Sequence, residues 1–177
     1  MKLSKAFLAL AMATAMATGV ANAATDTGHG TVKFTGSIID APCGISADTQ
    51  NQDVPLGAVA QHALENGGTS TPADFHLTLT QCDTATITNG MTITFTGTAD
   101  ATNADELAFG AGSSAAGASI AITGPDGSVI PLATASSPIA LNDGQNQLNF
   151  QAYLHGTGAT VTPGTFTSVA NFTLAYN

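Results

Sequence analysis

Residues 91–96 read MTITFT, a strict alternation of apolar and polar side chains. Successive side chains of a β-strand point to opposite faces of the sheet, so this period of two places Met91, Ile93 and Phe95 together on one face. Threonine favours strands because its branched side chain packs well on a pleated surface. The stretch therefore predicts a strand that buries one face and exposes the other.

The same period of two recurs on both sides of this stretch. We expect further strands or strand pieces at residues 31–39, 53–56, 75–80, 119–123, 129–132, 147–154 and 164–176. Turn residues separate several of them, at residues 124–127 (GPDG) and 142–144 (NDG). The first of these turns is expected to bring residues 129–132 back as the second strand of a hairpin.

Helical signal is weak along the chain. Residues 56–65 are expected to form no more than a turn or two, and residues 100–118, rich in Ala, Gly and Ser, a loop with a short strand piece. Several short strands separated by turn signals indicate an all-β sandwich. No repeat or linker divides residues 40–177, so we expect one domain there.

The first 23 residues have the order of a secretory signal. A short basic start at residues 1–5 precedes a mostly apolar run at residues 6–20, and Ala21-Asn22-Ala23 has the small-x-small form that signal peptidase cuts. A membrane anchor is the alternative, but the apolar run is too short and too rich in Ala, Thr and Gly for it. We expect cleavage after Ala23, or after Ala24.

The charge balance argues against one class of function. The chain has 3 Lys and Arg against 12 Asp and Glu, and a formal net charge of −9. Loss of residues 1–23 would leave Lys33 as the one basic side chain against all the acids. Such a surface repels nucleic acid and anionic lipid, so no nucleic-acid partner is expected.

The two cysteines, Cys43 and Cys82, are expected to form a structural disulfide. Export places them in an oxidising compartment, where a single pair usually bonds. A redox or metal pair is the alternative, but neither cysteine lies in a C-x-x-C motif or beside a histidine at ligand spacing. Chain-entropy arithmetic gives such a crosslink about 4 kcal/mol before strain is subtracted.

Residues that carry catalysis or bind metals are not grouped in this sequence. His29 lies in the leader, His76 alternates with apolar neighbours on a solvated strand face, and His62 and His155 read as surface positions. The adjacent acids Asp105 and Glu106 read as a solvated loop. No zinc-binding H-x-x-x-H, nucleophile elbow or phosphate-binding loop occurs. We expect no enzyme activity, no metal and no cofactor.

The two ends of the chain are unusual for a self-contained sandwich. Even positions from Gly164 to Tyr176 form one long, largely apolar face that continues almost to the last residue, whereas chain ends are usually polar and frayed. Residues 24–30 have little to bury and lead into the alternating residues 32–38. Ordinary first and final strands of one core remain the alternative.

These features together resemble the major subunits of the chaperone–usher pili, close to the type 1 and P-pilus pilins. The resemblance rests on residues 30–43 (GTVKFTGSIIDAPC), 75–83 (FHLTLTQCD) and 168–177 (SVANFTLAYN), with Gly164 fourteenth from the end and Tyr176 penultimate. It implies an incomplete immunoglobulin-like β-sandwich that lacks its final strand. It also implies that a donor strand from another protein fills the resulting groove.

The resemblance implies a role for each chain end. Residues 24–39 would be an N-terminal donor-strand extension and residues 40–177 the pilin domain. The donor face would comprise Val32, Phe34, Gly36 and Ile38. The acceptor groove and chaperone-binding strand would comprise Gly164, Phe166, Ala170, Phe172, Leu174 and Tyr176. The Asn177 carboxylate would lie where the family's chaperone presents basic residues.

The resemblance also implies function and partners. The subunit would polymerise with identical copies into the shaft of a surface pilus that supports cell adhesion. Its partners would be a periplasmic chaperone, an outer-membrane usher, and adaptor or tip subunits. A minor adaptor or a host-receptor-binding adhesin module of the same system is the alternative. Export through the periplasm and assembly on the cell surface would follow.

Overall fold

The computed structural model describes residues 28–177 of the chain, so the expected signal segment lies outside the described residues. The chain divides into two units, residues 1–37 and residues 38–177. In the first unit, residues 28–37 form no helix or strand. Val32 and Phe34 there are 74% and 89% exposed. The strand expected at residues 31–39 is therefore not formed in this structure.

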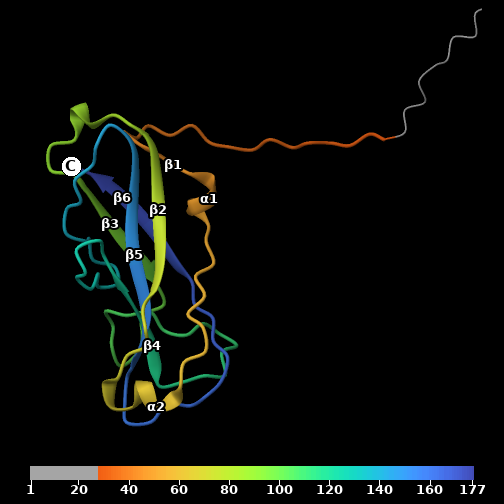
Figure 1. The fold of residues 1–177 in the computed structure, drawn as a ribbon, viewed down its shortest axis with the longest axis vertical. Coiled ribbons are helices and arrows are strands. Elements are labelled where there is room, and N and C mark those ends of the chain that lie inside the picture. Colours follow the sequence, from red (N-terminus) through yellow and green to blue (C-terminus); the bar gives the residue numbers. More distant parts are fainter. Residues whose placement is uncertain (1–27) are drawn as a thin grey trace, which may run out of the picture. The chain divides into compact units, whose positions relative to one another are not determined.

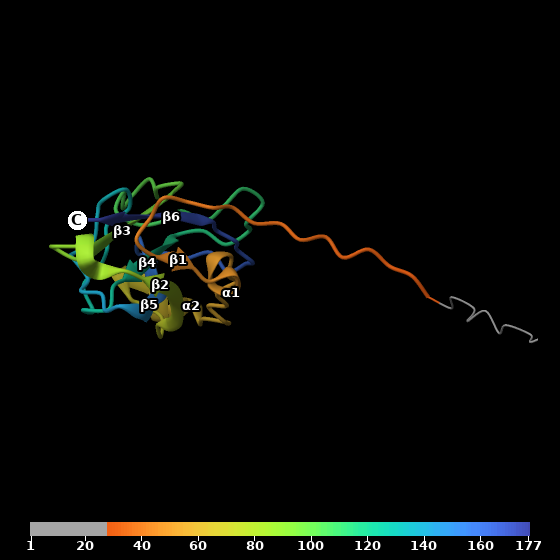
Figure 2. The ribbon, with the colours of Figure 1, turned by 90° about the horizontal axis from the view of Figure 1, so that it is seen from above.

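The second unit is a sandwich of two antiparallel sheets (Figures 1 and 2). The larger sheet has the strand order β1-β2-β5-β4, and the smaller pairs β3 with β6. The strands are β1 (Gly44–Ile45), β2 (Ala73–Cys82), β3 (Met91–Gly97), β4 (Ala118–Thr123), β5 (Gly144–Gly156) and β6 (Ala170–Tyr176). The helical turns are α1 (Ala47–Gln50), α2 (Gln61–Leu64), η1 (Glu65–Gly67) and η2 (Thr84–Thr86).

The long strands β2 and β5 form the centre of the larger sheet. Their register places Phe75 opposite Phe150 and Leu77 opposite Leu148, so apolar side chains meet across the strands. Burial alternates along β5 from Asn146 to Gly156, in step with the sequence pattern. The strands expected at residues 75–80 and 147–154 are confirmed, each within a longer strand.

Four phenylalanines join the two sheets across the core. The ring of Phe95 on β3 lies 5.7 Å from that of Phe150 and 6.3 Å from that of Phe75. On its own sheet, Phe95 lies 6.5 Å from Phe172 on β6. Edge-on aromatic packing at such distances adds to simple area burial. Strand β3, predicted from the alternation of residues 91–96, therefore supplies the central contact between the layers.

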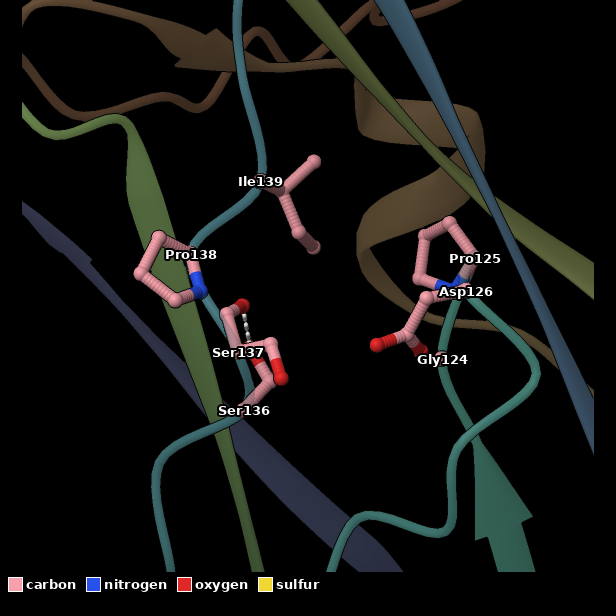
Figure 3. A pocket seen from close by; sticks show the side chains of 7 residues that line it. All are labelled: Gly124, Pro125, Asp126, Ser136, Ser137, Pro138 and Ile139. Atoms are coloured by element: carbon pink, nitrogen blue, oxygen red, sulfur yellow. Dashed lines mark hydrogen bonds between the residues drawn. The ribbon is translucent and has the colours of Figure 1, made fainter.

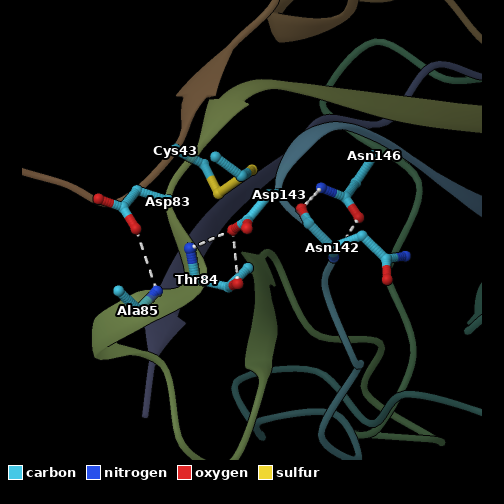
Figure 4. The surroundings of a disulfide bond; sticks show 8 residues. Cys43, Asp83, Thr84, Ala85, Asn142, Asp143 and Asn146 are labelled. Carbon is cyan, nitrogen blue, oxygen red and sulfur yellow. Dashed lines mark hydrogen bonds between the residues drawn. A yellow bond between two sulfur atoms is a disulfide. The ribbon is translucent and has the colours of Figure 1, made fainter.

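The predicted disulfide is confirmed. Cys43 and Cys82 are bonded, with Cα atoms 4.2 Å apart, and join the chain just before β1 to the end of β2. Both side chains are buried. Beside the bond, the Asp143 carboxylate accepts hydrogen bonds from the backbone N–H of Thr84 at 2.9 Å and its hydroxyl at 2.6 Å (Figure 4). The disulfide therefore strengthens one end of the larger sheet.

Three expectations about strands are corrected. Residues 53–56 form no strand. Residues 129–132 return along β4 with only one bridge, Thr123 to Val129, because the chain leaves the sheet at Pro131. The expected strand at residues 164–176 is regular only over Ala170–Tyr176. The helical turn expected within residues 56–65 is confirmed as α2.

Residues 164–169 leave the smaller sheet because they pair with a loop. Thr167 O accepts from Gly110 N at 2.6 Å, and Thr165 O accepts from Ser114 N at 2.8 Å. A Cβ on Gly164 would lie 2.5 Å from backbone atoms of Ser114 and Ala115. Gly164 therefore permits close backbone approach at this bend. Across residues 28–177, no helix is long and apolar enough to span a membrane.

Candidate strand-acceptor edge

Strand β6 is paired along one edge only. It runs antiparallel to β3, with Met91 opposite Tyr176 and Phe95 opposite Phe172. Within residues 38–177, no strand and no backbone hydrogen bond engages its other edge. An unpaired strand edge is a template for adding another strand. We call this side of Ala170–Tyr176 the acceptor edge.

The register shows which backbone groups the acceptor edge offers. Asn177 N donates to Gly90 O at 3.0 Å, so Asn177 and Gly90 form a hydrogen-bonded pair. Such pairs alternate with non-bonded pairs along an antiparallel ladder. The N–H and C=O groups of Phe172, Leu174 and Tyr176 therefore point away from β3, toward the open side.

Contacts on the other edge of β3 support this alternation of hydrogen-bonded and non-bonded pairs. Its outward-pointing residues should be Met91, Ile93 and Phe95, and each bonds to the segment beyond β3. Met91 exchanges two backbone bonds with Ile139, at 2.9 and 2.7 Å, and Ile93 O accepts from Ser136 N at 2.8 Å. Residues 133–139 thus cover the outer edge of β3. The two-stranded sheet is protected on the β3 side and open on the β6 side.

The side chains of the predicted acceptor residues share one property. Phe166, Ala170, Phe172, Leu174 and Tyr176 all pack against the core and are only half-buried. The intervening residues Asn171, Thr173 and Ala175 are exposed. The same even-numbered residues of β6 therefore present unpaired backbone groups and incompletely covered apolar side chains. Burial raises the pKa of Tyr176 above its usual value of 10.0.

An apolar cavity of about 210 Å³ lies beside the segment that leads into β6. Its walls include Leu64 on α2, Leu154 on β5, and the side chains of Phe109, Val161 and Phe166. The rings of Phe109 and Phe166 are stacked, with centroids 4.5 Å apart. The predicted acceptor residues are thus brought into one line, with Phe166 and Gly164 at the cavity and Tyr176 at the far end.

The apolar side chains of the predicted donor residues are exposed, and the space beside Gly36 is open. Ile38 in the second unit is fully exposed, and Val32 and Phe34 in the first are largely exposed; nothing lies within 4 Å of a Cβ built on Gly36. Exposed large apolar side chains in alternation are unusual on a soluble surface. Their role as a donor face stays a prediction.

The assignment of Glu106 to a solvated loop is wrong. Glu106 is only 6% exposed, and it binds both Ser119 on β4 and His155 on β5. His155 is half-buried and bonds to Glu106 through Nδ1 at 2.8 Å. The loop composition around Glu106 hid this cluster, since adjacent acids in an Ala-rich and Ser-rich segment give no periodic signal. His76 is exposed, as predicted.

A second cavity, of about 280 Å³, lies beside the turn that follows β4 (Figure 3). It is lined by Gly124, Pro125, Asp126 and residues 136–139. Asp126 is its one titratable side chain, and a hydrogen bond from the Ser128 hydroxyl lowers the pKa of this carboxyl below 3.8. Residues 28–177 contain no group of three or more His, Cys, Asp or Glu placed to hold a metal. The lining of this cavity therefore offers a single carboxylate.

The fold and the acceptor edge define a class of protein: an immunoglobulin-like sandwich in which one sheet lacks an edge strand. The model of the fimbrial protein family matches residues 32–177. The chain therefore belongs to the fimbrial protein family. Among curated proteins it is 52% identical to the Fimbria A protein of Serratia marcescens over 178 residues, covering 99% of each chain.

Other relatives agree with this assignment. The chain is 47% identical to the Major MR/P fimbria protein of Proteus mirabilis, again over 99% of each chain. Among solved structures, the P pilus rod subunit PapA matches with a TM-score of 0.68 and 32% identity, over 77% of this chain and all of that one. A chaperone–usher pilus structure matches with a TM-score of 0.74 and 32% identity, over 85% and 97% of the two chains.

Proposed function

We propose that this chain is the shaft subunit of a surface pilus and that it polymerises by donating residues 24–39 to the acceptor edge of another copy. The observation that carries the proposal is the open side of Ala170–Tyr176, where half-buried apolar side chains and unpaired backbone groups coincide. Strand addition of this kind is already established for chaperone–pilin complexes as a class. The names of the relatives support the shaft role.

The size of the expected gain explains why a donor is needed. Burying one large apolar side chain contributes roughly 1.5–3 kcal/mol. Val32, Phe34 and Ile38 together would contribute gross burial of about 5–9 kcal/mol on that scale. The net stability of a whole domain is about 5–15 kcal/mol. A subunit without a donor would therefore be marginal and prone to aggregate along its open edge.

Partners and location follow from this mechanism. Before assembly, a periplasmic chaperone would cover the acceptor edge, and an outer-membrane usher would exchange that chaperone for the next subunit. Adaptor or tip subunits would occupy one end of the homopolymer, and the assembled shaft would lie on the cell surface. No catalytic, metal or cofactor role is part of the proposal.

Deletion of residues 24–39 tests the proposal most directly. The truncated subunit should form no fibres by electron microscopy, yet it should still accept the complete subunit as a donor in co-expression. Matched point variants refine the test: Phe34→Asp should block assembly because it puts a charge into the groove, whereas Thr35→Asp, on the opposite face, should not. Fibres of normal length from the truncated subunit would refute the donor assignment.

A further inference from the structure

We propose that the cluster of Glu106, Ser119 and His155 is a positioning element for strand addition, because it holds in place the wall of the cavity beside Phe166. We call these three residues the Glu106 cluster. The proposal rests on the proposed function, since the cavity matters only if this end of the acceptor edge receives a strand. The three side chains come from a loop, from β4 and from β5, so the cluster ties three segments together.

The cluster is compact and largely shielded from water. Ser119 is fully buried, and its hydroxyl donates a hydrogen bond to Glu106 Oε2. His155 Nδ1 lies 2.8 Å from Glu106 Oε1 and 3.1 Å from Oε2. The Ser119 hydroxyl also lies 3.3 Å from the backbone oxygen of His155. Both carboxylate oxygens of Glu106 are therefore engaged.

Because residues 38–177 have so few basic side chains, the buried Glu106 depends on one basic partner, His155. Residues 38–177 contain no Lys or Arg. A buried carboxylate is costly unless it is paired and hydrogen-bonded, and removing one partner of such a pair is strongly destabilising. His155 is the one cation-capable side chain bonded to Glu106. Tyr153 on β5 also interacts with Glu106, and its pKa is raised by burial and then by the charge of Glu106.

The cluster lies directly behind the floor of the cavity. Ala118 and Leu154 line the cavity, and each immediately precedes a cluster residue, Ser119 or His155, on the same strand. Neighbouring side chains of a strand point to opposite faces. The cluster therefore fixes β4 and β5 from the outer face at the level where their inner face forms the cavity.

The segment after Glu106 carries the same restraint to the acceptor side. Leu107 exchanges two backbone hydrogen bonds with Ile120 on β4, both at 2.9 Å. Ser168 Oγ donates to Ala108 O at 2.7 Å, and Phe109 stacks on Phe166. From Glu106 onward, four consecutive residues thus connect the larger sheet to the segment that enters β6. Loss of the cluster should loosen Phe109 and let the cavity wall shift.

Capture of a donor peptide tests this positioning role. Oxidised mature subunit, residues 24–177, is unfolded in denaturant and diluted into a labelled synthetic peptide of residues 28–39. The capture rate is followed by fluorescence anisotropy, and the thermal midpoint of the complex is measured separately. Glu106→Gln keeps the side-chain shape but removes the charge, so capture should slow by roughly tenfold, the equivalent of one charge-assisted hydrogen bond.

Two controls separate positioning from general stability. Asp105→Asn removes the exposed neighbouring charge and should capture at the wild-type rate. Thr49→Ala removes a buried hydroxyl that accepts from Thr78 N at 3.0 Å, next to α1. Helix α1 lies at the opposite end of the sandwich from α2, which borders the cavity (Figure 1). Thr49→Ala should therefore lower the thermal midpoint without slowing capture.

Each outcome decides one claim. If wild-type subunit captures no peptide, the proposed function fails. The positioning role is refuted if wild type captures peptide and Glu106→Gln captures it equally fast. It is also refuted if Glu106→Gln is slowed only as much as Thr49→Ala when the two variants have the same thermal midpoint. Should Glu106→Gln fail to fold, His155→Gln decides, because His155 is partly exposed: slowed capture supports the role and an unchanged rate overturns it.

Discussion

Strands β5 and β6 have the same alternating sequence pattern and different surroundings. Strand β5 pairs with β2 on one side and β4 on the other, and Phe150 at its centre has an exposed fraction of 0%. Strand β6 pairs with β3 alone, and Phe172 at its centre is only half-buried. The two phenylalanines contact the same aromatic neighbour, Phe95. What differs is the number of neighbouring strands.

An incomplete sheet has a binding site for a further strand at the edge that lacks a neighbour. A third strand beside β6 would cover the flanks of Phe172, Leu174 and Tyr176 and would pair their outward N–H and C=O groups. In the larger sheet, the central strands β2 and β5 each already have a neighbouring strand on both sides. Strand β6 therefore offers a partner both unpaired backbone groups and incompletely covered apolar side chains.

The largest expected effect separates the two strands directly. Phe150→Ala should lower the free energy of unfolding by about 3–5 kcal/mol, because it leaves a cavity in the complete core. Its effect should be the same with and without the peptide of residues 28–39. Phe172→Ala should lower the free energy of unfolding by less in the free subunit than in the peptide-bound subunit. Denaturant unfolding with and without peptide measures both, and equal effects of Phe172→Ala in the two states would contradict the comparison.

Removal of the disulfide should have the next largest effect and should fall on the complete sheet alone. Replacing both Cys43 and Cys82 by Ser should lower the free energy of unfolding by about 2–4 kcal/mol, since the unfolded chain loses its crosslink. The bond joins the chain just before β1 to the end of β2, and both of these strands belong to the larger sheet. The peptide capture rate, measured on the folded fraction, should therefore not change. A slowed capture would show that the two sheets are coupled.

The smallest expected effect concerns pH. Hydrogen bonds from the Thr84 hydroxyl and then from its N–H lower the pKa of the exposed Asp143 carboxyl below 3.8. A depressed pKa contributes stability that is present above pH 3.8 and is lost as pH falls through the lowered value. Asp143→Asn should remove this contribution and flatten the acid end of the pH–stability curve slightly.

A matched control tests that pH effect. Asp53 is exposed and forms no hydrogen bond within the described residues. Asp53→Asn should therefore leave the acid end of the pH–stability curve unchanged. Thermal midpoints between pH 7 and pH 2.5 measure both variants. Identical acid limbs for wild type and Asp143→Asn would refute the contribution. The site belongs to the disulfide end of the larger sheet, so peptide capture should be unaffected (Figure 4).

Local pattern was sufficient for some parts of the molecule and misleading for others. Alternation correctly predicted the strands around Phe95 and Phe150, because each buries one face along its whole length. It failed at residues 164–169, where the alternation continues but the backbone pairs with residues 110–115 instead of β3. Pairing partners distant in sequence are invisible to a local period.

The Glu106 cluster was missed for a related reason. Its members lie 13 and 49 positions from Glu106, and none belongs to a motif. One signal was available: with no Lys or Arg in residues 38–177, a buried acid can find a cationic partner there only in histidine, and otherwise relies on neutral hydrogen-bond donors. That signal says what kind of partner to expect and leaves open which acid is buried.

The amino-acid sequence by itself determined the disulfide-bonded, all-β character of this protein, because cysteine count and side-chain period can be read directly from the chain. It also determined that two alternating segments, one at each end of the chain, carry apolar faces. Only the tertiary structure decided that β6 keeps one edge free and that Glu106 is buried behind the cavity. Both depend on which distant strands become neighbours, and that choice is made by packing of the whole core.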